Sequence, residues 1–190
     1  MEIILALCIG IGLSAACGFR VFVPLFMMSI AAITGFFTPA QGFEWLALPT
    51  VCLGLGIATI SEISAYYIPW VDNLLDTIAT PAALMAGTIT TMAVINGDMS
   101  EFATWAAAII VGGGTASAVQ VTTVAARGLS TTTTGGLGNF VISTLEWIGA
   151  MLVSVLALLL PVVMVIALIV MAYFTVRWMM QRKRQNQEVV

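Results

Sequence analysis

Hydrophobic positions in this chain come in runs of about twenty residues or more, separated by short polar or proline-containing stretches. A bilayer's hydrocarbon core is about 30 Å thick, so a helix rising about 1.5 Å per residue crosses it in roughly 20 residues. Six runs meet or approach that length. They are residues 3–37, 45–67, 74–95, 102–126, 140–160 and 162–180. The pattern predicts an all-α integral membrane protein with about six transmembrane helices.

The first run is too long for one straight crossing. Its 35 residues would form a helix of about 50 Å, and Gly18-Phe19-Arg20 and Pro24 interrupt it. We therefore expect this helix to be broken or bent near Arg20. Two crossings or a re-entrant hairpin in this run would change both the number of crossings and the side of the amino terminus. Pro81 predicts a kink in the third run.

A polar stretch from Arg127 to Asn139 separates the fourth and fifth runs, and it contains Thr131 to Thr134 followed by Gly135-Gly136-Leu137-Gly138. Such a sequence is not typical of a lipid-facing helix, so a loop or a re-entrant segment is expected. Backbone amides in a glycine-rich turn can bind an anion, and Asn139 is expected to cap the next helix. The alternative is a tight connection between two helices. The candidate binding residues here are Thr133, Thr134, Gly135, Gly136 and Asn139.

Composition excludes several classes of protein. With 61% hydrophobic residues, 8% charged residues and a mean hydropathy of +1.09, the chain does not resemble a soluble domain. Four of its six cationic residues lie in the last fourteen positions, so no basic surface for nucleic acid is expected. Histidine is absent and the only lysine, Lys183, lies in the polar tail, which argues against an enzyme. No metal or cofactor is expected.

The basic residues at the carboxyl terminus predict the orientation. Arg182-Lys183-Arg184 directly follows the last run, so the positive-inside rule places the carboxyl terminus in the cytoplasm. We expect one transmembrane domain, residues 1–180, and a polar cytoplasmic tail, residues 181–190. Six crossings would place the amino terminus in the cytoplasm as well, and Glu44, Asp98 and Glu101 in external loops.

Four ionisable residues fall within or beside the apolar runs: Arg20, Glu62, Arg127 and Glu146. A charge inside the hydrocarbon costs several kcal/mol, so such residues are expected to pair or to line a polar cavity. Both glutamates are expected about 9 Å below the inner surface, facing one vestibule. The alternative is that these residues form ion pairs that only hold helices together.

The stretch from Pro69 to Asp76 is typical of a helix start, with Asn73 as the N-cap and Asp76 in the first turn. Capping alone explains this spacing. A functional interpretation places Asp72 and Asp76 at the inner mouth beside Glu62, where they would hold a cation or relay protons.

Taken together, these polar residues resemble a bacterial membrane family known as domain of unknown function 4126. The resemblance extends from Ile4 to about Pro161 and implies a location in the bacterial inner membrane, but it implies no activity. The residues that carry it are Gly18-Phe19-Arg20 with Pro24, Glu62, Pro69-x-Val71-Asp72-Asn73-x-x-Asp76 with Thr80-Pro81, Arg127-x-x-Ser130-Thr131-x-Thr133-Thr134-Gly135-Gly136-Leu137-Gly138-Asn139, Ser143 and Glu146.

Our hypothesis is a small membrane transporter or channel for an anionic or zwitterionic solute. Arg20 and Arg127 would attract its negative group, while Glu62, Asp76 and Glu146 would balance charge or couple protons. One alternative is a flippase for a phosphate-bearing lipid carrier, and another is a non-catalytic scaffold or accessory subunit. The expected partners are the lipid bilayer and a small-molecule or lipid-phosphate ligand, and formation of a homo-oligomer stays open.

Overall fold

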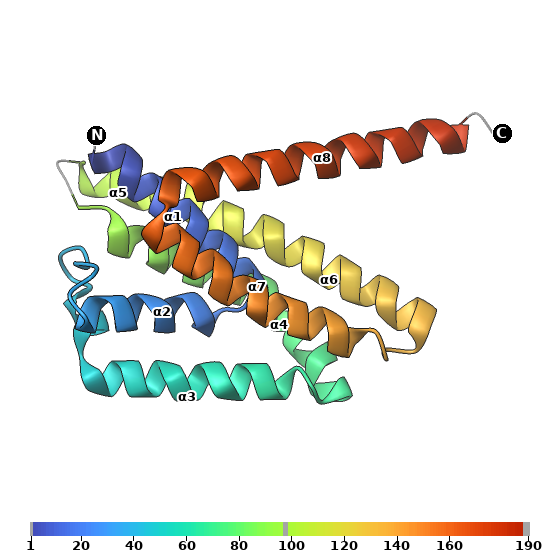
Figure 1. Ribbon diagram of the computed structural model, residues 1–190, viewed down its shortest axis with the longest axis horizontal. Helices are drawn as coiled ribbons and strands as arrows, with labels where there is room; N and C mark the ends of the chain where they lie inside the picture. The colour runs from blue at the N-terminus through green and yellow to red at the C-terminus, as the bar shows by residue number, and fades with distance from the viewer. Residues whose placement is uncertain (1, 97–98, 188–190) are drawn as a thin grey trace.

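Helices make up nearly all of the protein in the computed structural model, which describes residues 2–96 and 99–187 (Figure 1). Asp98 lies outside these residues. The described part contains no strand, so the all-α prediction is confirmed. In chain order the elements are α1 (Glu2–Phe19), α2 (Phe22–Ile33), the 3-10 helix η1 (Glu44–Ala47), α3 (Pro49–Ala65), α4 (Pro69–Val94), α5 (Glu101–Ala107), the π-helix η2 (Ala108–Gly113), α6 (Gly114–Thr134), α7 (Asn139–Leu159) and α8 (Pro161–Gln187).

Small side chains fill the interior and large apolar side chains cover the outside. Ala16, Ala83 and Ala116 are buried, whereas Leu53 and Phe102 are largely exposed. Lipid is as apolar as leucine, so helices in a bilayer associate through close packing of small residues rather than by hiding large ones. Among the described residues, three helical segments are long and apolar enough to cross a membrane: Trp70–Val94, Glu101–Thr134 and Asn139–Leu159. The fold is therefore compatible with the membrane protein that the sequence predicts.

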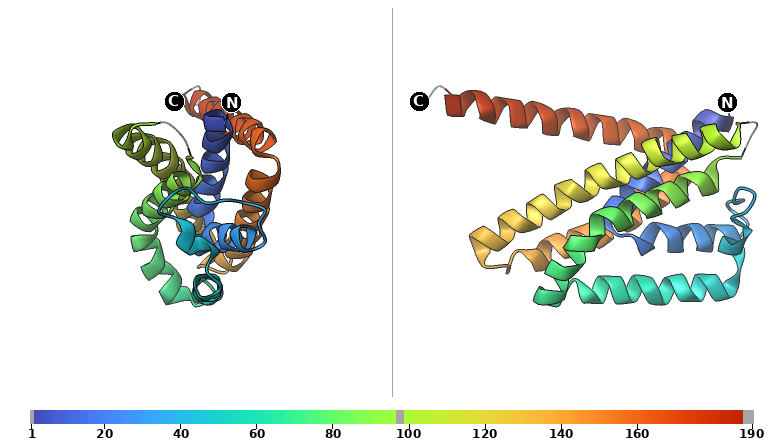
Figure 2. Two further views of the ribbon diagram at one scale, coloured as in Figure 1. Left: turned by 90° about the vertical axis from the view of Figure 1, so that its left-hand side faces the viewer. Right: turned by 180° about the vertical axis from the view of Figure 1, so that it is seen from behind.

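Helix α1 lies at the centre of the bundle, in contact with α4, α6, α7 and α8 (Figure 2). Small residues allow this position, because a Cβ atom on Gly18 would lie 2.5 Å from the carbonyl oxygen of Ala116. Polar contacts reinforce the packing. The Ser14 hydroxyl donates to the Gly87 carbonyl at 2.9 Å and lies 2.9 Å from the hydroxyl of Thr91. Hydroxyl bonds of this kind join helices where water is absent.

The first apolar run forms two helices, since α1 ends at Phe19 and α2 begins at Phe22. The chain reverses between them (Figures 1 and 2). Gly10 of α1 lies against Thr91 of α4, and the Ala40 amide beyond α2 donates to the Ala93 carbonyl at 2.8 Å. The middle of α1 and the segment that follows α2 therefore approach the same part of α4. We call this unit the α1–α2 hairpin; its tip is Arg20 and Val21.

The predicted loop from Arg127 to Asn139 is mostly helical, so this prediction is wrong in extent. Helix α6 continues to Thr134, and only the turn at residues 135–138 separates it from α7. The threonine hydroxyls donate to carbonyls of their own helix, Thr133 to Leu129 at 2.8 Å and Thr134 to Ser130 at 2.8 Å. This bonding satisfies the hydroxyls without interrupting the helix. Gly135 and Gly136, with φ of 63° and 90°, then end it.

The predicted start of the helix that follows α3 is also wrong. Helix α4 begins at Pro69, with Ile68 in extended conformation before it, because proline is well suited to the first helical position. Asn73 therefore lies inside the helix and is not its N-cap, and its side chain falls outside the described part. Pro81 also lies within α4.

The two ends of the bundle differ in what they carry (Figure 1). The end of α4 and the junction of α7 with α8 lie at one end, with η1; we call this the η1 end. The α3–α4 junction and the turn from Gly135 to Gly138 lie at the other, the α6–α7 end, where the rings of Tyr67 and Phe140 stack with centroids 6.2 Å apart. The start of α1 and the end of α8 lie toward opposite ends.

Replacing Gly87 by alanine tests this close packing. A Cβ atom there would lie 2.6 Å from the Ala116 Cβ and 2.7 Å from the Gly112 carbonyl oxygen. Gly87→Ala is expected to lower the free energy of unfolding by about 1–3 kcal/mol, measured by thermal unfolding in detergent. The control is Gly54→Ala, where no atom lies within 4 Å, and it should be neutral or slightly stabilising. Equal losses in both variants would contradict the packing argument.

Candidate functional site

Five ionisable side chains meet inside the bundle, and we call them the charge cluster. They come from the hairpin tip, α4, α6 and α7. All but one are almost fully buried, with Arg20 and Arg127 each 1% exposed, and the Asp76 side chain is 15% exposed. The members of the cluster are Arg20, Asp72, Asp76, Arg127 and Glu146.

Arg127 is at the centre of the cluster, and each of its guanidinium nitrogens donates to a carboxylate. Its Nε donates to Glu146 Oε1 at 3.1 Å, and its Nη2 donates to Glu146 Oε2. Its Nη1 donates to Asp72 at 3.1 Å and to Asp76 at 2.5 Å. The paired bonds to Glu146 are the fork arrangement that makes arginine–carboxylate contacts strong. In this conformation Arg127 has no nitrogen left for an incoming anion.

Arg20 is bonded less completely. Its Nη2 lies 3.0 Å from Glu146 Oε2 and donates to the Ser143 carbonyl at 3.3 Å. Its Nε and Nη1 are buried and have no hydrogen-bond partner in the described part of the chain. A buried donor without a partner costs free energy, so these two N–H groups are suited to donate hydrogen bonds to a ligand. Of the two cluster arginines, Arg20 has the free donors.

The ring of Tyr66 lies under both guanidinium groups. The Cζ atoms of Arg20 and Arg127 lie 3.7 Å and 4.2 Å from the ring centroid. A cation over an aromatic face is attracted by the ring quadrupole, which helps two like charges share this space. Tyr66 was absent from the sequence-based candidates. It directly follows α3 and precedes another tyrosine, and its sequence context gives no sign of this contact.

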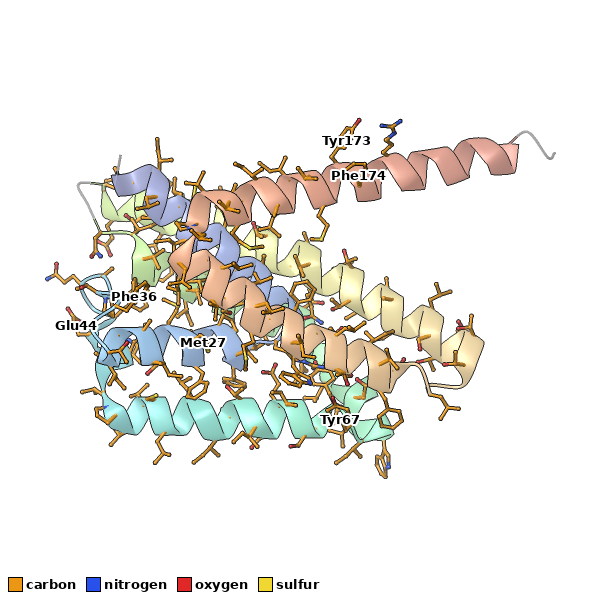
Figure 3. All side chains as sticks on the ribbon, in the orientation of Figure 1. Met27, Phe36, Glu44, Tyr67, Tyr173 and Phe174 are labelled. Atoms are coloured by element: carbon orange, nitrogen blue, oxygen red, sulfur yellow. The ribbon has the colours of Figure 1, made fainter. Side chains whose placement is uncertain are left out.

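Tyr67 points toward α7 and ties the α3–α4 junction to that helix (Figure 3). Its hydroxyl lies 2.7 Å from the Thr144 hydroxyl and accepts a hydrogen bond from the Trp147 indole at 3.2 Å. These bonds hold the segment that carries Tyr66, so they help to position its ring against the two arginines. Tyr67 was also absent from the sequence-based candidates.

Glu62 does not join the ion pairs of the cluster. Its carboxylate accepts hydrogen bonds from the amides of Val21 at 2.8 Å and Phe22 at 3.0 Å. These are the first amides of α2, which have no partner within that helix and lie at its positive end. Glu62 therefore caps α2 from the neighbouring helix α3, and it fastens the hairpin tip. We expected Glu62 and Glu146 to face one vestibule, but the Glu62 carboxylate instead bonds to the start of α2.

The charge cluster contains more negative than positive groups. Two arginines face three carboxylates, which leaves one formal negative charge in excess. Buried ion pairs stabilise a fold only where their charges and hydrogen bonds are well matched. This cluster therefore has two mismatches, one surplus carboxylate and one incompletely bonded arginine.

A pocket of about 130 Å³ opens at the α6–α7 end and reaches the charge cluster at Asp72. We call it the Asn139 pocket. Asn139 is the first residue of α7 and makes no capping bond, so its predicted role as a cap is wrong. Its Nδ2 donates to Asp72 Oδ2 and to the Thr131 hydroxyl, both at 3.1 Å. The lining residues are Tyr66, Tyr67, Asp72, Thr131, Gly135, Gly136, Leu137, Asn139 and Phe140.

The glycine-rich turn uses several of its amides internally. The Leu137 amide donates to the Thr134 carbonyl, the Gly138 amide to the Thr134 hydroxyl, and the Asn139 amide to the Gly136 carbonyl. Fewer donors are therefore available for an anion than the sequence suggested. Gly135 and Gly136 do line the pocket, whereas Thr133 and Thr134 lie exposed on α6.

Comparison with known proteins identifies a family. The sequence profile described as Domain of unknown function (DUF4126) matches residues 7–181. The chain belongs to this family. No curated protein and no solved structure matches the chain. The DUF4126 match includes every member of the charge cluster and of the Asn139 pocket, and it confirms the resemblance inferred from the sequence.

Charge balance predicts different effects for two cluster variants. Arg127→Gln leaves three carboxylates facing one arginine, so it is expected to lower the free energy of unfolding by about 3–5 kcal/mol. Asp76→Asn removes the surplus charge at a more exposed position and should change stability by less than about 1 kcal/mol. Thermal unfolding of the purified variants in one detergent measures both. Equal destabilisation by the two substitutions would show that charge balance does not govern the cluster.

Proposed function

We propose that this DUF4126 protein is a small membrane transporter, and that its solute site is the charge cluster together with the Asn139 pocket. One observation carries the proposal: a buried cluster with unused donors on Arg20 adjoins a pocket in a chain with an apolar exterior. Intramembrane charges persist mainly where they are functional or closely paired. A cluster that served packing alone would be expected to satisfy its donors.

In our proposed topology, five segments cross the membrane and the α1–α2 hairpin enters it from one side. The crossing segments are α3, α4, the continuous α5–η2–α6, α7 and α8, which run between the two ends of the bundle (Figure 1). The basic residues Arg182, Lys183 and Arg184 near the end of α8 would place the α6–α7 end in the cytoplasm. The amino terminus would then lie outside, unlike in the six-crossing expectation.

The hairpin tip supports a site for a negative group. Transporters commonly bind anionic groups at the start of a discontinuous helix, near the bilayer midplane. Here the Glu62 carboxylate already occupies the first amides of α2, so a carboxylate fits this position. Arg20 is the adjacent residue and has two unused donors. A carboxylate or phosphate of the solute would bind Arg20 here.

The surplus negative charge of the cluster favours a zwitterionic solute over a simple anion. An anion would bring a second unbalanced charge into a buried site, which is costly at low dielectric. A zwitterion adds no net charge, and its positive group compensates the third carboxylate. The expected solute is therefore small and carries both signs.

The shared carboxylate of Glu146 provides a way to change state. Its Oε2 is the closest acceptor for both Arg20 and Arg127. A solute carboxylate that binds Arg20 would replace Glu146 there and leave Glu146 on Arg127 alone. The contact of α7 with the hairpin tip would weaken, while the contact of α7 with α6 through Arg127 remained. A ligand with different affinity for the two arrangements would shift the population between them.

Cysteine labelling distinguishes the proposed topology from six crossings. In a variant without Cys8, Cys17 and Cys52, single substitutions Glu2→Cys, Gln41→Cys and Leu137→Cys are treated with a membrane-impermeant maleimide in intact cells. The proposed topology predicts labelling at positions 2 and 41, and labelling at 137 only after permeabilisation. Both topologies agree at 41 and 137, which serve as controls. Protection of position 2 in intact cells would support six crossings.

Uptake into proteoliposomes tests transport. Radiolabelled glycine, β-alanine, taurine and phosphoethanolamine serve as zwitterions, and acetate serves as an anion. At least one zwitterion should accumulate above empty liposomes, and Arg20→Gln should reduce its uptake about tenfold or more, because a charge-assisted hydrogen bond is lost. The matched control is the exposed Arg177→Gln on α8, which should keep wild-type uptake. Equal uptake by both variants, or none by the wild type, would favour the scaffold alternative.

A further inference from the structure

The Asn139 pocket presents hydrogen-bond acceptors and aromatic faces, and no lysine or arginine is among the described residues that line it. Asp72 contributes a carboxylate at its inner side. Tyr66, Tyr67 and Phe140 contribute rings. This set of groups is suited to a cation that donates hydrogen bonds, and it differs from the surroundings of Arg20, where donors are in excess.

The orientation of the Asn139 amide is determined by its neighbour. Its Nδ2 donates to Asp72 Oδ2 at 3.1 Å, and the opposite orientation would set a carbonyl oxygen against a carboxylate. Its Oδ1 is therefore an acceptor, and it has no hydrogen-bond partner in the described structure although the residue is only 9% exposed. A buried acceptor of this kind requires a donor from a ligand or from water.

Charge and aromatic contacts both favour a cation over a neutral donor. The charge cluster behind Asp72 has one formal negative charge in excess. The stacked rings of Tyr67 and Phe140 belong to the pocket wall, and aromatic faces attract ammonium groups. The volume of about 130 Å³ compares with roughly 10–15 Å³ for one water on a similar measure. A small alkylammonium group fits this space.

We infer that the Asn139 pocket binds an alkylammonium group, with Asn139 Oδ1 accepting one N–H and Asp72 balancing the charge. This inference rests on the proposed function for its role, since it assigns the positive group of a zwitterionic solute to this pocket and the negative group to Arg20. The binding itself does not require transport. The ammonium group belongs either to a free solute or to an aminophospholipid headgroup.

Methylammonium is the probe. The unfolding midpoint of the protein in phosphatidylglycerol nanodiscs is measured against methylammonium chloride, with potassium chloride at equal ionic strength as the reference. Methylammonium should raise the midpoint, and potassium should not. Asn139→Leu should weaken the apparent affinity about tenfold. The matched control Gln120→Leu alters a buried amide outside the pocket and should bind as the wild type does.

Phe140→Leu gives a second variant in case Asn139→Leu does not fold, and it should weaken binding several-fold through loss of one aromatic wall. Equal stabilisation by potassium, or wild-type affinity in either pocket variant, would overturn the inference. Weaker methylammonium binding in phosphatidylethanolamine nanodiscs would identify the lipid as a source of the group, and unchanged binding would identify a free solute. Methylammonium binding without uptake of any zwitterion would refute only transport, whereas uptake without methylammonium binding would refute only this assignment.

Discussion

The pairing of Arg127 with carboxylates from other helices is the interaction on which the rest of this structure depends. Its guanidinium is 1% exposed and donates to Asp72, Asp76 and Glu146, so it joins α6 to both α4 and α7. An isolated charge in an apolar bilayer is very costly, whereas one bonded at every nitrogen is tolerated. The requirement to keep these partners together fixes how three helices meet. The Asn139 pocket reaches that meeting point at Asp72, and the ring of Tyr66 lies against Arg127 there.

Close packing brings the second arginine to the same place. Small residues along α1 let this helix run through the middle of the bundle, and the chain reverses directly after Arg20. The reversal leaves the first amides of α2 without partners in their own helix. Glu62 supplies the acceptor from α3 and so connects the hairpin tip to a helix outside the cluster. The position of Arg20 thus depends on packing on one side and on a capping carboxylate on the other.

The sequence predicted an all-α fold of apolar helices and most members of the charge cluster, because charges in apolar runs are few and each needs a partner. It placed Asp72 and Asp76 at a helix start and did not predict that both meet Arg127, since that contact depends on how distant helices cross. Tyr66 had no distinguishing sequence context. The end of α6 was predicted too early, because threonine hydroxyls that donate to carbonyls of their own helix let this polar sequence remain helical. Asn139 does not cap α7, because its side-chain amide donates to Asp72 of the distant helix α4 instead.

The sharing of Glu146 Oε2 by two arginines has a thermodynamic consequence. Coupling free energies are reciprocal: if separating Glu146 from Arg20 strengthens its bonds to Arg127, then strengthening those bonds makes the separation easier by the same free energy. If a solute binds Arg20 as we propose, residues that only adjust how α6 and α7 approach each other would alter its affinity without touching it. Through Glu146 Oε2, the spacing of α6 and α7 is thereby linked to the hydrogen bonding of Arg20 at the hairpin tip.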